Sequence, residues 1–119
     1  MKKIYFLKTC DTCTRILKQI DTSGFILQDI KTTPITVAQL EEMYKRSKSY
    51  EALFSRRAKK YKEMALKDQV LSETDFKQLI LEHYTFLKRP VIIDGDKIFI
   101  GNSKAIVAEL VKNYGNRIL

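Results

Sequence analysis

The feature that most constrains this chain is a pair of cysteines, Cys10 and Cys13, at the boundary between two different sequence patterns. An apolar run over residues 4–7 precedes the pair, and a run with helical spacing over residues 16–20 follows it. A strand that leads through a tight loop into a helix would place Cys10 at the helix N-terminus, where unpaired N–H groups and the helix dipole favour a thiolate. Because the thiolate is the nucleophile, the pattern predicts a thiol redox site, with Cys13 able to close a disulfide with Cys10.

The residues alone leave two other interpretations of the cysteine pair open. The pair could be half of a zinc site, since CxxC is a common zinc-ligand spacing. Structural zinc almost always takes four ligands, and the sole histidine is His83, so acidic side chains would have to complete the site. The pair could also be two inert, buried cysteines. The position at a strand-to-helix junction favours the redox interpretation, and we expect no bound metal.

Length and composition predict a single domain over residues 1–119, because 45% of the residues are hydrophobic. No apolar run approaches the ~18 residues of a membrane-spanning helix. The apolar stretch after the first three residues is too short for a signal peptide. We therefore expect a cytoplasmic chain without membrane contact, in which a CxxC pair is reduced or cycling.

The net charge of +8 comes from 22 basic and 14 acidic residues, with basic clusters near residues 45–48 and 56–62. Such clusters could attract an anionic substrate, an acidic protein surface or nucleic acid. A solvated surface is the simpler interpretation for most of these lysines. The base-reading motifs of nucleic-acid binders are absent, so we expect no sequence-specific contact with nucleic acid.

The order of the expected elements predicts the fold class. Strands are expected at residues 3–7, 25–30, 89–93 and 97–100, with a helix over residues 12–23 that ends before Gly24. The Asp94-Gly95 pair predicts a hairpin, and Asn102 or Ser103 caps a last helix that ends at Gly115. The pattern β-α-β, helical insert, β-β-α predicts an α/β, thioredoxin-like protein with a four-stranded mixed sheet.

A helical insert is expected over residues 34–86. Thr36 with Gln39, and Ser72 with Asp75, have the spacing of capping boxes at two of its helices.

The cysteine pair after the first strand, the helical insert and the stretch Leu-Lys-Arg-Pro-Val-Ile-Ile over residues 87–93 resemble the arsenate reductase (ArsC)/Spx family of the thioredoxin-like superfamily. That family includes glutaredoxin-linked arsenate reductases and Spx-type transcription regulators. The resemblance covers essentially the whole chain, and Gly101 fits the Spx-like branch.

The resemblance implies a role for each matching residue. Cys10 matches the nucleophile, which in the reductases forms a thiolate–arsenate adduct. Cys13 matches the second cysteine of the Spx-type switch, a position that is serine in typical reductases. Arg89 matches the arginine that helps to hold the oxyanion, and Pro90 resembles the cis-proline that faces the active cysteine. Arg57 matches an arginine that recurs in Spx-like members.

The chain also departs from the reductases, which surround their cysteine with three arginines. Arg89 matches one of them. Ser55 stands at the apparent second position, with Arg56 and Arg57 close by, and Gly101 or a neighbour stands at the third. A pocket built from Arg57, Arg89 and the backbone of the Cys10 loop would carry less positive charge, which argues against arsenate as the physiological substrate.

Two main hypotheses follow. The first is a thiol-dependent oxidoreductase without a resident cofactor, reset by glutathione, glutaredoxin or thioredoxin. The alternative is an Spx-type redox-sensing regulator that binds RNA polymerase, and a catalytically idle family member is a third possibility. In each case a monomer is expected.

Overall fold

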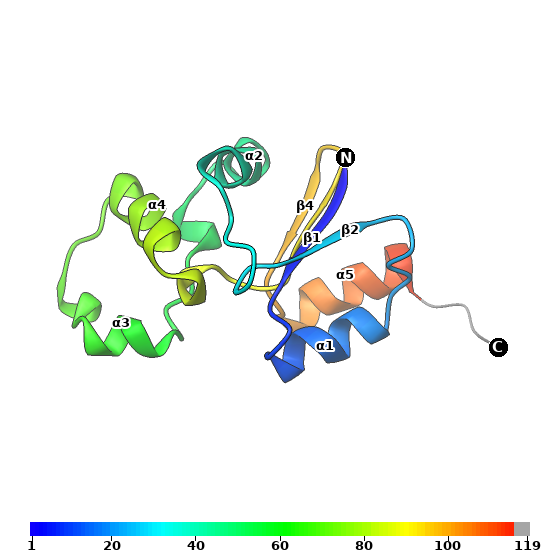
Figure 1. Ribbon diagram of the computed structural model, residues 1–119, viewed down its shortest axis with the longest axis horizontal. Helices are drawn as coiled ribbons and strands as arrows, with labels where there is room; N and C mark the ends of the chain where they lie inside the picture. The colour runs from blue at the N-terminus through cyan, green and yellow to red at the C-terminus, as the bar shows by residue number, and fades with distance from the viewer. Residues whose placement is uncertain (116–119) are drawn as a thin grey trace. The chain divides into compact units, whose positions relative to one another are not determined.

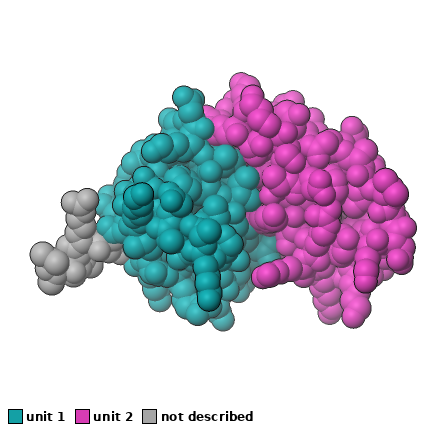
Figure 2. Space-filling view, turned by 180° about the vertical axis from the view of Figure 1, so that it is seen from behind, with its two compact units in different colours: residues 1–33, 89–119 teal, residues 34–88 magenta. Residues whose placement is uncertain are grey.

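The computed structural model describes residues 1–115, and the described chain divides into two compact units. The first unit contains residues 1–33 and the chain from residue 89 onward, and the second contains residues 34–88 (Figure 2). No helix within residues 1–115 is long and apolar enough to cross a bilayer.

The first unit is built on a four-stranded sheet in the order β2-β1-β3-β4. Strands β1 and β2 pair in parallel, whereas β1 with β3 and β3 with β4 pair antiparallel. The strand bounds are β1 Lys2–Phe6, β2 Ile26–Asp29, β3 Val91–Asp94 and β4 Lys97–Ile100. The mixed sheet and the hairpin between β3 and β4 confirm the predicted fold class.

Two helices cover one face of this sheet, α1 (Asp11–Lys18) and α5 (Lys104–Tyr114) (Figure 1). Their apolar sides pack on the strands in a single cluster. Side chains share one face at every second residue of a strand and about every 3.6 residues of a helix, so apolar residues at these spacings form one apolar face on each element. The buried members of the cluster are Ile4, Ile16, Ile20, Phe25, Ile92, Phe99 and Leu110. Ser103, one of the two expected caps, accepts a hydrogen bond from the N–H of Ile106 at the start of α5.

Helix α1 ends at Lys18, so the prediction of a helix to residue 23 was wrong. A tertiary contact overrides the helical pattern, because Ile20 pairs with Gly115 in an isolated β-bridge. The N–H of Asp21 then donates to the carbonyl of Tyr114 at 2.7 Å. Gly24 therefore lies in the following loop and does not cap the helix.

Strand β2 is shorter than predicted, and two of its apolar side chains face solvent. Ile26 and Leu27 are 66% and 43% exposed. The reason is position, because β2 is an edge strand of the sheet.

The second unit is helical and holds its own aromatic core. Its α-helices are α2 (Val37–Ser47), α3 (Lys59–Glu63) and α4 (Glu73–Glu82), and its 3-10 turns are η1 (Glu51–Leu53), η2 (Leu66–Asp68) and η3 (Tyr84–Phe86). The two predicted capping boxes, at Thr36 and Ser72, are present. Phe54 lies at the centre of the core, with ring centroids 4.9 Å from Phe76 and 5.0 Å from Phe86.

Candidate functional site: the Cys10–Cys13 helix start

The loop that follows β1 places Cys10 at the first turn of α1. The N–H of Cys10 donates to the carbonyl of Leu7 at 3.0 Å, which turns the chain out of the strand. Cys10 has an extended backbone (φ −94°, ψ 112°), and its carbonyl accepts the N–H of Thr14 at 3.1 Å, the first bond of the helix. Cys10 is therefore the N-cap residue, with its sulfur at the positive end of the helix dipole.

Cys10 is partly buried, Cys13 is fully buried, and both are free thiols. Partial burial alone would raise the pKa of Cys10. The pKa is nevertheless lowered from its usual value, because the backbone N–H and the thiol of Cys13, the charge of Arg89 and the N–H of Thr12 favour the thiolate. The side chain of Cys10 makes no ordinary N-cap hydrogen bond, so these N–H groups act on the sulfur chiefly as oriented dipoles.

The pKa of Cys13 is shifted in the opposite direction. Burial raises the pKa of its thiol to about 11, and the neighbouring Cys10 thiolate opposes a second negative charge, although the backbone of Leu7 favours ionisation. As the pH rises, Cys10 therefore ionises first. Cys13 stays protonated through the neutral range, and its thiol favours the Cys10 thiolate. The fold thus gives the two thiols different protonation states in the neutral range.

Sheet register brings Arg89 and Pro90 to the cysteines. Because β3 runs antiparallel to β1 and pairs Val91 with Tyr5, the residues just before β3 lie at the end of β1 from which the Cys10 loop departs. The Arg89–Pro90 peptide bond is cis. The charge of Arg89 acts on both thiols from this position.

The turn after β4 holds both carbonyls of the Arg89–Pro90 segment. The N–H of Gly101 donates to the carbonyl of Pro90 at 2.9 Å, and Gly101 adopts φ +85°, a conformation that favours glycine. The side-chain amide of Asn102 donates to the carbonyl of Arg89 at 3.4 Å. Sequence reasoning treated Asn102 only as a possible helix cap, because a bond to a residue 13 positions away leaves no local signal.

We expect Asn102→Ala to raise the pKa of Cys10 by loosening the backbone that carries Arg89. Asn113→Ala is a matched control, because it removes a similar amide-to-carbonyl bond, to Glu109 at 2.8 Å, on the exposed side of α5. The measurement is the rate of iodoacetamide alkylation of Cys10 against pH. Identical profiles for the two variants would show that Asn102 does not position Arg89.

The other predicted arginine, Arg57, belongs to the second unit. Arg57 is exposed at the turn before α3, where its backbone N–H donates to the side-chain hydroxyl of Ser55 at 3.3 Å. Its place in an anion pocket with Arg89 therefore stays a prediction. Its exposed neighbour Arg56 forms an ion pair with Glu51 of the same unit at 2.7 Å and lies over the ring of Phe76.

The zinc alternative would require further ligand side chains near the cysteine pair. Within residues 1–115, no group of three or more His, Cys, Asp and Glu side chains has the geometry to hold a metal ion. His83 lies at the C-terminal end of α4, where its ring contacts that of Phe86 at 5.6 Å.

Fold and site together define a thioredoxin-like α/β protein with paired cysteines at its first strand-to-helix junction, next to a segment with a cis proline. A sequence model of the ArsC family matches residues 5–110. The chain therefore belongs to the ArsC family.

Individual relatives agree with this assignment. The chain is 26% identical over 102 residues to the uncharacterized protein YusI of Bacillus subtilis, covering 82% of this chain and 86% of the relative. It is 24% identical over 118 residues to the global transcriptional regulator Spx of Streptococcus pneumoniae, covering 96% and 89%. A solved arsenate reductase from Vibrio cholerae superposes with a TM-score of 0.71 at 24% identity, covering 92% and 96%, which shows the shared fold.

Proposed function

We propose that this chain is a thiol–disulfide oxidoreductase in which Cys10 is the nucleophile and Cys13 the resolving cysteine. The observation that carries the proposal is geometric: Cys10 is the partly exposed N-cap residue of α1, and Cys13 is buried one turn later. The directions of the pKa shifts agree with it, lowered at Cys10 and raised to about 11 at Cys13. A disulfide reductase needs one thiol that attacks first and a second that stays protonated and close until a mixed disulfide exists. Membership of the ArsC family supports the same assignment.

The steps follow from these protonation states. The Cys10 thiolate attacks one sulfur of a substrate disulfide, such as a glutathione mixed disulfide, and the second substrate sulfur leaves and takes up a proton. Cys13 then loses its proton and attacks the Cys10 sulfur, which releases the first substrate sulfur as a thiol. The substrate has gained two electrons and two protons, and the protein holds a Cys10–Cys13 disulfide. Glutathione, glutaredoxin or thioredoxin returns the two electrons, and no resident cofactor is required.

Mass spectrometry after mild oxidation tests this assignment. Wild type is expected to form a Cys10–Cys13 disulfide, whereas Cys13→Ser treated with glutathione disulfide should accumulate a glutathione adduct on Cys10. Cys10→Ser is the control, and it should collect far less adduct because Cys13 is buried and protonated. If Cys10 forms neither product, the redox assignment fails.

A second candidate is a redox-sensing regulator. The similarity to Spx of Streptococcus pneumoniae extends over 96% of this chain and favours this candidate. In this case the Cys10–Cys13 disulfide would alter binding to RNA polymerase. Pull-down of purified RNA polymerase by the reduced and the oxidised protein separates the two functions, since absence of binding in both states would eliminate the regulator.

A further inference from the structure

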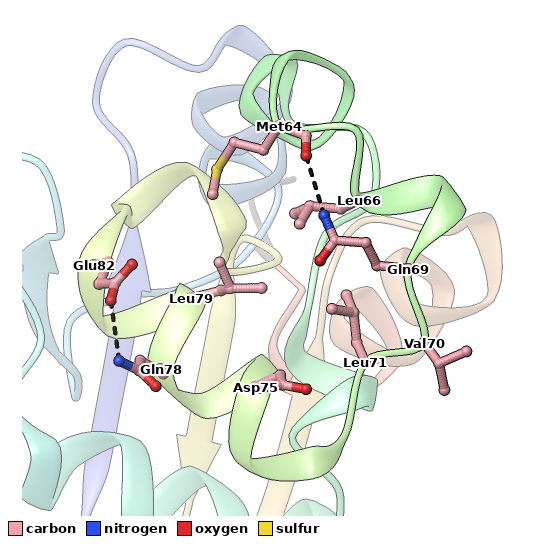
Figure 3. Close-up of a pocket in the computed structure, with 9 residues that line it drawn as sticks. All are labelled: Met64, Leu66, Gln69, Val70, Leu71, Asp75, Gln78, Leu79 and Glu82. Atoms are coloured by element: carbon pink, nitrogen blue, oxygen red, sulfur yellow. Dashed lines mark hydrogen bonds between the residues drawn. The ribbon is translucent and has the colours of Figure 1, made fainter.

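A hollow of about 240 Å³ lies in the second unit, between the chain that follows α3 and one side of α4 (Figure 3). Its apolar lining comes from Met64, Leu66, Val70, Leu71 and Leu79. In the close-up, Leu79 rises from α4 beneath Met64 and Leu66. Small-molecule sites usually measure roughly 300–1,000 Å³, so this space suits one or two side chains of a partner better than a cofactor.

Two of the apolar residues contribute little to the core. Val70 is fully exposed and Met64 is 38% exposed, whereas Leu66 beside them is buried. Flexible methionine side chains commonly adapt to apolar groups that dock from outside. The lining therefore offers apolar surface that the fold itself leaves uncovered.

The polar lining is acidic, although the chain as a whole carries a net charge of +8. Of the nine lining residues, the charged ones are Asp75 and Glu82. The Asp75 pKa lies below its ordinary value, because the backbone N–H and side chain of Ser72 favour the carboxylate. Asp75 therefore stays negative through the neutral range and serves as the capping-box residue of α4.

Unlike Asp75, Glu82 lies at a helix position that does not stabilise a negative charge. It lies in the last turn of α4, where the helix dipole disfavours a negative charge. The side-chain amide of Gln78 donates to one of its carboxylate oxygens at 3.3 Å. Glu82 thus places a negative charge at the rim of the hollow at a position where helix stability would favour a basic residue.

We propose that this hollow, here called the α4 groove, docks a segment of a partner protein that carries an apolar side chain next to a lysine or arginine. The apolar side chain would fill the space above Leu79, and the basic group would lie against Glu82 and Asp75. Charge complementarity favours a basic group at this place, because both charged residues of the lining, Asp75 and Glu82, are carboxylates. The proposal goes beyond the redox chemistry and does not depend on it.

Two short peptides with blocked termini test the charge preference, one alternating leucine with lysine and the other leucine with glutamate. The probe is the ¹⁵N–¹H NMR spectrum of the full chain, titrated to millimolar peptide. The leucine–lysine peptide is expected to shift amides of residues 64–71 and 75–82, and the leucine–glutamate peptide is not. Equal shifts with both peptides, no shift with either, or shifts confined to other residues would overturn the proposal.

A charge-reversal pair supplies the control. Glu82→Lys is expected to weaken binding of the leucine–lysine peptide by roughly fivefold or more, since an attractive charge becomes repulsive. Glu63→Lys makes the same charge change at an exposed residue of α3 outside the lining, and it should change binding by less than about twofold. Equal binding by the two variants would overturn the proposal.

Two further measurements test whether weaker peptide binding by Glu82→Lys reflects misfolding, and whether peptide binding depends on the redox-active cysteine. The melting temperature of Glu82→Lys should not fall below that of wild type, because the helix dipole favours lysine there. Cys10→Ser should bind the peptide as wild type does, so the docking test stands even if the redox assignment fails.

Discussion

Replacing Arg89 with alanine is expected to raise the pKa of the Cys10 thiol and to slow its alkylation at neutral pH by severalfold, up to an order of magnitude. The charge of Arg89 is one of the groups that lower this pKa. A thiol with a lowered pKa is ionised at a lower pH, so removal of the cation moves the onset of the reaction to higher pH. At pH values below the Cys10 pKa of the variant, its alkylation rate should therefore be lower than that of wild type. In alkaline solution the two rates should become similar.

The measurement is the rate of iodoacetamide alkylation across the pH range, with the modified cysteine identified by mass spectrometry. Iodoacetamide is uncharged, so loss of Arg89 acts on the thiol and not on attraction of the reagent. Arg15→Ala is the matched control, because Arg15 is an exposed arginine of α1 two residues after Cys13. If Arg89→Ala and Arg15→Ala give the same profile, the specific action of Arg89 on Cys10 is refuted.

The second large effect is structural, because Phe54→Ala is expected to destabilise the second unit by about 3–5 kcal/mol. Phe54 is 0% exposed and contacts the rings of Tyr61, Phe76 and Phe86. Truncation removes these contacts and leaves a cavity in a core that three helical segments share. Because the chain has no tryptophan, urea unfolding is best followed by circular dichroism.

Val70→Ala is the control for this experiment, because Val70 is fully exposed in the same unit. Its free energy of unfolding should lie within about 0.5 kcal/mol of wild type. A Phe54→Ala protein as stable as Val70→Ala would show that the aromatic cluster does not hold the second unit together.

Local signals along the chain predicted the elements that local interactions determine. The capping boxes at Thr36 and Ser72 and the turn at Gly95 were correctly placed, because each depends on residues at most three positions apart. The end of α1 was misplaced. It is set by the pairing of Ile20 with Gly115, which are 95 positions apart, and no local pattern reports such a contact.

The candidate site also combines features that local sequence predicts with features that only long-range packing determines. The sequence alone determined that Cys10 stands at a strand-to-helix junction with Cys13 one turn later, because strand period, helix period and cysteine spacing are all local. The place of Cys10 at the helix start also predicted it as the thiolate, but only the tertiary structure decided that Cys13 stays protonated, because Cys13 is buried. The approach of Arg89 along the β1–β3 register lowers the pKa of both thiols. Burial and the nearby charge depend on how distant segments pack, because desolvation and charge act through space and not along the chain.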